Sequence, residues 1–209
     1  MAQRSLLAVK LVAFVSCSIP LAWLVLKGLG AADLSLGANP VETVLHSLGT
    51  TALNLLLIGL AVTPLRRLTG LNMLVRLRRM LGLFCFFYLV LHFLSYALLD
   101  LQLAWETLFV DITQRPYISV GMLALVAMIP LAATSTQAMQ RRLGRRWGQL
   151  HRMIYPISVL AVTHFIWQTK ADLFEPLVYS SILAALLGYR IVRWLGNRRR
   201  RSQSKQALA

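Results

Sequence analysis

Six long apolar runs divide this chain, and they restrict its fold more than any other feature of the sequence. An α-helix needs about 20 residues to cross the roughly 30 Å hydrocarbon core of a bilayer, and each run is close to that length. We therefore expect an all-α integral membrane protein: a six-transmembrane-helix bundle forming one domain over residues 1–196, with a basic, disordered tail over 197–209. The predicted spans are residues 8–27, 43–63, 81–101, 117–134, 149–168 and 176–195.

The composition agrees with a membrane protein. Hydrophobic residues make up 57% of the 209 residues, and charged residues make up 14%. Soluble domains have about 45–50% apolar residues and about 25% charged residues. Both fractions therefore exclude an ordinary soluble domain.

The net charge is +15, and the basic and acidic residues are concentrated in different connections between the apolar runs. Arginines crowd the second and fourth connections between the runs and the start of the tail, whereas the acidic residues lie in the other three connections or, for Asp100, at the adjoining end of the third run. Lys and Arg mark cytoplasmic loops, so the pattern predicts both termini in the cytoplasm of a multi-pass membrane protein. The charge then reports topology and attraction to anionic membrane lipid, and it excludes a nucleic-acid partner because no soluble basic domain exists.

The first run offers one alternative. Residues 1–10 are basic, an apolar run follows, and small residues at 28–32 resemble a signal-peptidase site. However, the run exceeds the roughly 7–15 residues of a signal-peptide core, and Pro20 interrupts it. We favour an uncleaved first helix, since cleavage would leave five helices and an external N-terminus.

The connections contain further expected elements. Leucines alternate with arginines over 63–80, which predicts an amphipathic stretch along the headgroups. Over 134–152, Ser135 or Thr136 is placed to cap a short helix, and Gly144 interrupts the segment.

The chain shows no internal repeat, no second domain and no glycine-rich nucleotide-binding motif. The outer loops are too short to form a catalytic domain. We therefore expect no catalytic residue and no bound NAD(P)H, which means that the chain is not an enzyme on its own.

All four histidines fall within or at the edge of a predicted span, where ionisable groups are costly and usually functional. Helical rise places His92 and His164 roughly 17 Å and 22 Å from the cytoplasmic ends of their spans, and His151 only about 3 Å. Two imidazoles from facing helices, such as His92 and His164, can bind haem iron on both sides. This arrangement suits electron transfer through haem b better than oxygen chemistry.

His151 indicates a second, inner site. It precedes His164 by 13 residues, or roughly 20 Å along a helix, which separates an inner site from an outer one. An ideal helix would place the two side chains on different faces, although Pro156 between them can rewind the helix. The third span offers no second histidine opposite His151, so a haem count of one or two stays open.

Three further residues have open roles. His46 is an alternative outer ligand, a donor to a haem propionate, or an interfacial residue. Arg78 and Arg79 determine topology first, and they are also candidates to bind haem propionates, an FMN phosphate or a quinol headgroup at the inner face.

Two strings carry a family resemblance. The first runs R-R-M-L-G-L over 78–83 and continues to L-H-F-L-S-Y over 91–96, and the second runs L-G-R-R-W-G-Q-L-H-R-M-I-Y over 143–155. On these strings, the chain from about Gly30 to Arg193 resembles the ferric-reductase-like transmembrane family.

The resemblance implies a specific function. It implies a haem-binding inner-membrane subunit that passes electrons from the quinone pool, with FMN as a further candidate cofactor. The implied acceptor is a periplasmic molybdopterin reductase that repairs oxidised methionines in envelope proteins. The resemblance also implies that His92, His151 and His164 bind haem iron and that Arg78 and Arg79 contact a flavin or an inner site.

Three alternatives remain open. One is a haem-containing transmembrane reductase, of ferric iron or another outer acceptor. Another is a proton-coupled small transporter, which predicts inverted repeats or helices broken near the midplane. The last is a structural subunit without cofactor, which would leave four intramembrane histidines unexplained.

Overall fold

The computed structural model describes residues 2–31, 35–169 and 172–206, and all regular elements in these residues are helical. Ala32 of the small-residue segment and residues 207–209 of the predicted tail lie outside the described residues. The helices are α1 Ala2–Gly28, α2 Pro40–Thr69, α3 Leu74–Ser95, α4 Trp105–Gln114, α5 Pro116–Ala133, α6 Gln137–Leu143, α7 Arg145–Leu150, α8 Ile154–Gln168 and α9 Phe174–Gln206. A π-helical segment, η2, covers Tyr96–Asp100, and a 3-10 turn, η3, covers His151–Met153.

Within the described residues, five helices are long and apolar enough to cross a membrane. These segments are Leu7–Gly28, Pro40–Thr69, Leu74–Asp100, Pro116–Ala133 and Phe174–Arg198. The all-helical membrane fold is therefore confirmed, but a sixth continuous span is not. The predicted span 149–168 is interrupted by η3, and α8 has only 15 residues, fewer than the roughly 20 that a crossing needs.

Pro156 explains part of this interruption. It occupies the first turn of α8, where backbone N–H groups have no partner within the helix. A proline is therefore tolerated there without a lost hydrogen bond. The helix is rewound immediately before Pro156, over η3, which is close to where the sequence predicted it.

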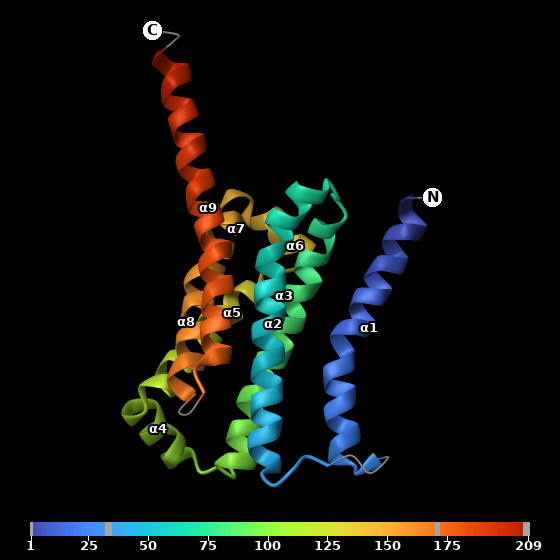
Figure 1. Cartoon of the computed structure of the whole chain (residues 1–209), viewed down its shortest axis with the longest axis vertical. Coiled ribbons are helices and arrows are strands. Elements are labelled where there is room, and N and C mark those ends of the chain that lie inside the picture. Colours follow the sequence, from blue (N-terminus) through green and yellow to red (C-terminus); the bar gives the residue numbers. More distant parts are fainter. Residues whose placement is uncertain (1, 32–34, 170–171, 207–209) are drawn as a thin grey trace.

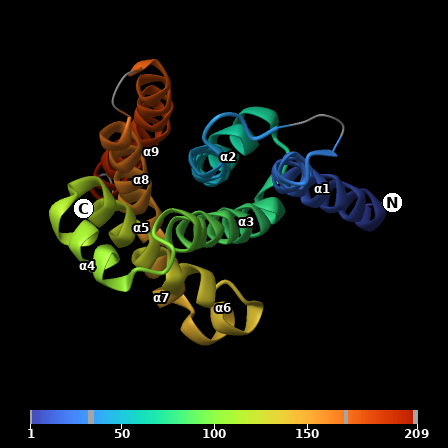
Figure 2. The ribbon, with the colours of Figure 1, turned by 90° about the horizontal axis from the view of Figure 1, so that it is seen from below.

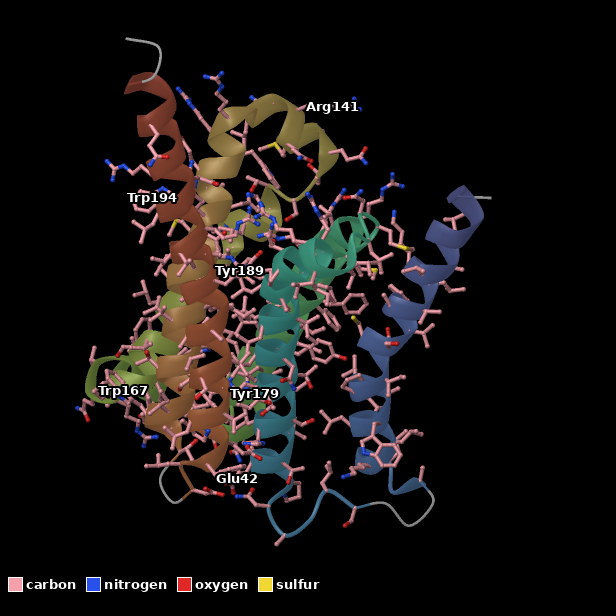
Figure 3. All side chains as sticks on the ribbon, turned by 45° about the horizontal axis from the view of Figure 1, so that its top comes forward. Glu42, Arg141, Trp167, Tyr179, Tyr189 and Trp194 are labelled. Atoms are coloured by element: carbon pink, nitrogen blue, oxygen red, sulfur yellow. The ribbon has the colours of Figure 1, made fainter. Side chains whose placement is uncertain are left out.

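Helices α2, α3, α5 and α8 pack around a common core, α9 lies against α2 and α8, and α1 lies at the edge against α2 and α3 (Figures 1 and 2). We call the end of the bundle that carries α4 the α4 end, and the opposite end, with α6 and α7, the α6 end. Helix α1 begins and α9 ends at the α6 end (Figure 1). Figure 3 shows Arg141 at the α6 end and Glu42 at the α4 end, in line with the charge pattern of the sequence.

The predicted amphipathic stretch over 63–80 coincides with the end of α2, which continues to Thr69, and with the start of α3 at Leu74. Gly70 ends α2 in the left-handed conformation, with φ of +73° and its N–H donating to the Arg66 carbonyl. The tail differs from the prediction of a disordered segment: it is helical to Gln206, because nothing after Gly196 breaks a helix and Arg, Lys and Gln favour one.

One connection is as predicted, and one element was missed. Helix α6 begins after Thr136, whose hydroxyl accepts a hydrogen bond from the Met139 N–H, and it ends at Gly144. Helix α4, in the connection between the third and fourth predicted spans, was not predicted from the sequence.

The Tyr88 side chain, on α3, forms two hydrogen bonds with the backbone of α1. Its hydroxyl donates to the Cys17 carbonyl at 2.7 Å and accepts from the Leu21 N–H at 3.2 Å. Both groups belong to the turn around Pro20, which has no N–H to donate. Tyr88 is 1% exposed, so water does not reach its hydroxyl. Without Tyr88, the Cys17 carbonyl and the Leu21 N–H would lose this buried hydrogen-bond partner.

Replacement of Tyr88 by phenylalanine should lower the free energy of unfolding by about 1–3 kcal/mol, because two buried backbone groups lose their partner. Thermal unfolding of the detergent-purified protein measures this change. Tyr155→Phe is the matched control, since the Tyr155 ring, which phenylalanine keeps, is the part that meets the Arg190 guanidinium at 5.4 Å. Equal losses in both variants would contradict the assignment.

Candidate functional site

A cavity of about 280 Å³ lies in the core between α2, α3, α5 and α8. Most of its wall consists of leucine, methionine, alanine and aromatic side chains. Its polar and charged lining residues are His46, Thr50, His92, Tyr96, Asp100, Arg115, Tyr117, His164 and Gln168. Most of these residues lie near the helix termini at the α4 end, so the cavity is polar at that end and apolar deeper in the bundle.

His92 from α3 and His164 from α8 meet across this cavity. Their ring centroids are 6.3 Å apart, and the ring planes are nearly perpendicular, at 80°. The sequence had placed the two residues at matching depths on separate helices. The structure brings them together in one site.

Each of these imidazoles is oriented by a backbone carbonyl of a neighbouring helix. The His92 Nδ1 lies 2.9 Å from the Leu45 carbonyl on α2, and the His164 Nδ1 lies 2.6 Å from the Tyr117 carbonyl on α5. A carbonyl only accepts, so Nδ1 carries the proton in both rings. Each Nε2 is then left with a free lone pair, as a metal-ligating histidine requires.

A glycine one turn along from each carbonyl makes room for the ring. A Cβ atom at Gly49 would lie 3.1 Å from the His92 Cε1, and a Cβ atom at Gly121 would lie 2.8 Å from the His164 Nδ1. The second distance is shorter than Cβ contacts allow. Glycine is therefore needed at 121, and at 49 a larger residue would displace the imidazole.

These contacts reveal an internal repeat, which the sequence analysis had missed. In three pairs of residues with equivalent roles, the members are 72 positions apart: Leu45 and Tyr117, Gly49 and Gly121, His92 and His164. Further pairs are identical at this offset, among them Ser47 and Ser119, Ala52 and Ala124, Leu53 and Leu125, Phe93 and Phe165.

The repeat relates the hairpin of α2 and α3 to the hairpin of α5 and α8. Helices α2 and α5 both begin at the α4 end, so the two hairpins run in the same direction (Figure 1). The repeat is therefore parallel and lacks the inverted topology that the transporter alternative predicts. The cavity lies between the two halves, and each half contributes one imidazole.

His46 lies at the edge of the same cavity, in the second turn of α2. Its ring is exposed and tilted against Phe165, with centroids 6.3 Å apart. No ring contact of His46 with His92 or His164 accompanies the one with Phe165, whereas His92 and His164 contact each other directly.

His151 lies at the α6 end, apart from the cavity. Its ring stacks on Trp147 with centroids 3.9 Å apart, and its Nδ1 is 3.1 Å from the Trp147 carbonyl. The His151 Nε2 is buried and has no hydrogen-bond partner among the described residues. Arg78 and Arg79 are exposed at the start of α3, at the same end of the bundle (Figure 1).

A polar network closes the α4 end of the cavity. The Tyr96 hydroxyl donates to Asp111 Oδ2 at 2.5 Å, and Arg115 Nε pairs with Asp111 Oδ1 at 3.0 Å. Arg115 Nη1 also donates to the Tyr117 hydroxyl at 3.4 Å. This hydrogen bond and the Asp111 carboxylate raise the pKa of Arg115, so the guanidinium stays charged. Sequence reasoning missed the network because it treated Asp111 and Arg115 as loop charges.

Comparison with known proteins places the chain in a family. Residues 47–162 match the family described as "Ferric reductase like transmembrane component". A relative from Xanthomonas campestris pv. campestris (strain 8004) is 53% identical over 165 residues, which cover 79% of this chain and 76% of the relative. It is named "Protein-methionine-sulfoxide reductase heme-binding subunit MsrQ". The chain belongs to the MsrQ family.

The match to MsrQ, also called YedZ, extends over nearly the whole chain. An MsrQ from Rhodospirillum rubrum is 48% identical over 194 residues, or 92% of this chain and 91% of the relative. No solved structure matches. The resemblance to the ferric-reductase-like transmembrane family is thereby confirmed.

The side chains of the cavity fit the haem that the name of these MsrQ relatives implies. Two imidazoles oppose each other, and each has its Nδ1 occupied by a carbonyl. Bonds from a first-row metal to imidazole are about 2.0–2.1 Å, as for zinc, so two of them span about 4 Å. The two ring radii account for the remainder of the 6.3 Å between centroids. The apolar wall matches a porphyrin ring.

Proposed function

We propose that the chain is the haem b electron-transfer subunit of a methionine sulfoxide reductase system, with no catalytic residue of its own. It carries electrons from the quinone pool across the bacterial inner membrane to a periplasmic, MsrP-like molybdopterin reductase, which repairs oxidised periplasmic proteins. The observation that supports this proposal is the opposed pair His92 and His164 in an apolar cavity inside a membrane bundle.

The residues of the cavity have distinct parts in this function. His92 and His164 would hold the haem iron, and the carbonyls of Leu45 and Tyr117 keep both rings in one tautomer. Haem held by these two histidines would supply a one-electron carrier, and ligation by both imidazoles would suit electron transfer better than oxygen chemistry. The apolar wall excludes water and lowers the local dielectric around the site.

The proposed topology has six crossings with both termini in the cytoplasm. Helices α7 and α8, joined by η3, together run from Arg145 to Gln168 and make the fifth crossing. The concentration of arginines at the α6 end supports a cytoplasmic position for this end, since cytoplasmic loops are rich in Lys and Arg.

His151 is proposed to ligate a second haem at the α6 end. A buried, unpartnered Nε2 is rare in proteins and calls for a partner that completes its bonding. Arg78 and Arg79 border this region and are proposed to contact propionates, an FMN phosphate or a quinol headgroup. Electrons would then enter at the α6 end and leave at the α4 end.

The test uses the purified protein in detergent. A quinol should produce a b-type reduced-minus-oxidised spectrum, and a pyridine haemochrome assay should count two haems per chain, or one if His151 binds none. An MsrP-like reductase supplied with methionine sulfoxide should then reoxidise the haem, whereas a ferric chelate should not. Faster reoxidation by the chelate favours the transmembrane ferric reductase, and a colourless protein expressed with ample haem rejects the electron-carrier function.

A further inference from the structure

The cavity between His92 and His164 is amphipathic along its length. Leu56, Met128 and Ile157 line its deep part, whereas Tyr96, Asp100 and Arg115 line its α4 end. A haem has the same asymmetry, with an apolar ring and two carboxylates, the propionates, on one edge. Burying a carboxylate in an apolar wall is costly, so the propionate edge belongs at the α4 end.

The Arg115 guanidinium is held in position at this end and has N–H donors available for an anion. It is the one Arg or Lys among the described residues that line the cavity. Asp111, 5% exposed, anchors the guanidinium through Nε, and Tyr117 approaches Nη1. A guanidinium has five N–H donors, so donors remain free for a second carboxylate. The Arg115 side chain is 52% exposed and therefore reaches the cavity mouth without being enclosed.

Asp111 itself is fixed from the other side. The Tyr96 hydroxyl, on the π-helical segment η2, donates to the second carboxylate oxygen. Asp111 therefore has one oxygen for Tyr96 and one for Arg115. Helix α4, which the sequence did not predict, holds this carboxylate against the mouth of the cavity.

We infer that Arg115 is a propionate-binding residue, which fixes the haem of this cavity with its carboxylate edge at the α4 end. This inference rests on the proposed function. It orients the haem so that its polar edge lies toward the surface on which the outer electron acceptor would dock. Arg115 then contributes to haem affinity and raises the haem midpoint potential, because its positive charge favours the reduced, more negative form.

The test compares haem b with its dimethyl ester, which lacks both carboxylates. The full-length chain and Arg115→Gln are each loaded with either porphyrin in a host that cannot synthesise haem. Loss of porphyrin to excess apomyoglobin and the midpoint potential are then measured. With haem b, Arg115→Gln should lose the porphyrin roughly tenfold to a hundredfold faster, as expected for one charge-assisted hydrogen bond, and its midpoint potential should fall. With the ester, wild type and variant should lose porphyrin at the same rate.

Equal acceleration with both porphyrins would show a merely structural role for Arg115 and would overturn the inference, as would no acceleration with haem b. Arg141→Gln removes the same charge at the α6 end, and its porphyrin loss should equal that of wild type. A wild-type chain that takes up neither porphyrin would instead refute the proposed function.

Discussion

Alanine at either His92 or His164 should abolish haem binding in the cavity, while the chain still inserts and accumulates in the membrane. Each substitution removes one of the two ligands, and the remaining imidazole cannot reach the other face of the ring. The loss is measured as the b-type absorbance of the reduced-minus-oxidised spectrum per chain. If His151 holds a second haem, the pyridine haemochrome count falls from two to one.

His46→Ala is the control for this prediction, because His46 lies at the edge of the same cavity but is exposed and does not oppose another imidazole. It should retain the full haem count. Retention of haem by both His92→Ala and His164→Ala would contradict the assigned ligand pair. Loss in His46→Ala together with only one of them would make His46 the second ligand.

Leucine at Gly121 should eliminate the haem of this cavity nearly as completely as loss of His164 itself. Even a methyl group at this position would come within 2.8 Å of the His164 Nδ1, and a leucine side chain would occupy the volume of the imidazole. Leucine favours a helix more than glycine does, so α5 itself should form normally. The haem count and the electron paramagnetic resonance of the low-spin iron measure the effect.

Substitutions at two glycines of α2 test the same steric argument, one with a smaller expected effect and one with none. Gly49→Ala would place its methyl group 3.1 Å from the His92 Cε1, so it should shift the low-spin signal and weaken haem binding without abolishing it. A core overpacked by one methyl group typically costs about 1–3 kcal/mol. Gly59 has open space at its Cβ position, and Gly59→Leu should keep its haem. Equal haem loss at Gly59 and Gly121 would refute the steric argument.

Hydropathy and helix geometry predicted the elements that depend on local sequence. The apolar runs predicted the membrane helices, because their length follows from the bilayer thickness. A constant rise per residue placed His92 and His164 at matching depths. The Thr136 cap and the break at Gly144 were also predicted, because capping depends on a few adjacent residues.

The other features depend on tertiary contacts that no local pattern records. The carbonyls of Leu45 and Tyr117 are 47 residues from the histidines that they orient, and a backbone carbonyl leaves no mark in a sequence. The two hairpins share only scattered identities, so the sequence alone does not make the repeat apparent. The contacts of the two carbonyls and the two glycines with their histidines define it. One signal was available: Gly49 and Gly121 are as far apart as the two histidines.

The parallel repeat also bears on the origin of the bundle. Each hairpin carries a complete half of the site, with one histidine, the carbonyl that orients it and the glycine that admits it. Two copies of a single hairpin, related by a twofold axis along the membrane normal, would therefore present a matched pair of imidazoles. A homodimer of a short two-helix ancestor is the simplest precursor of such a chain, and gene duplication with fusion would join its subunits. The two halves differ at equivalent positions, with His151 in one where the other has Arg79.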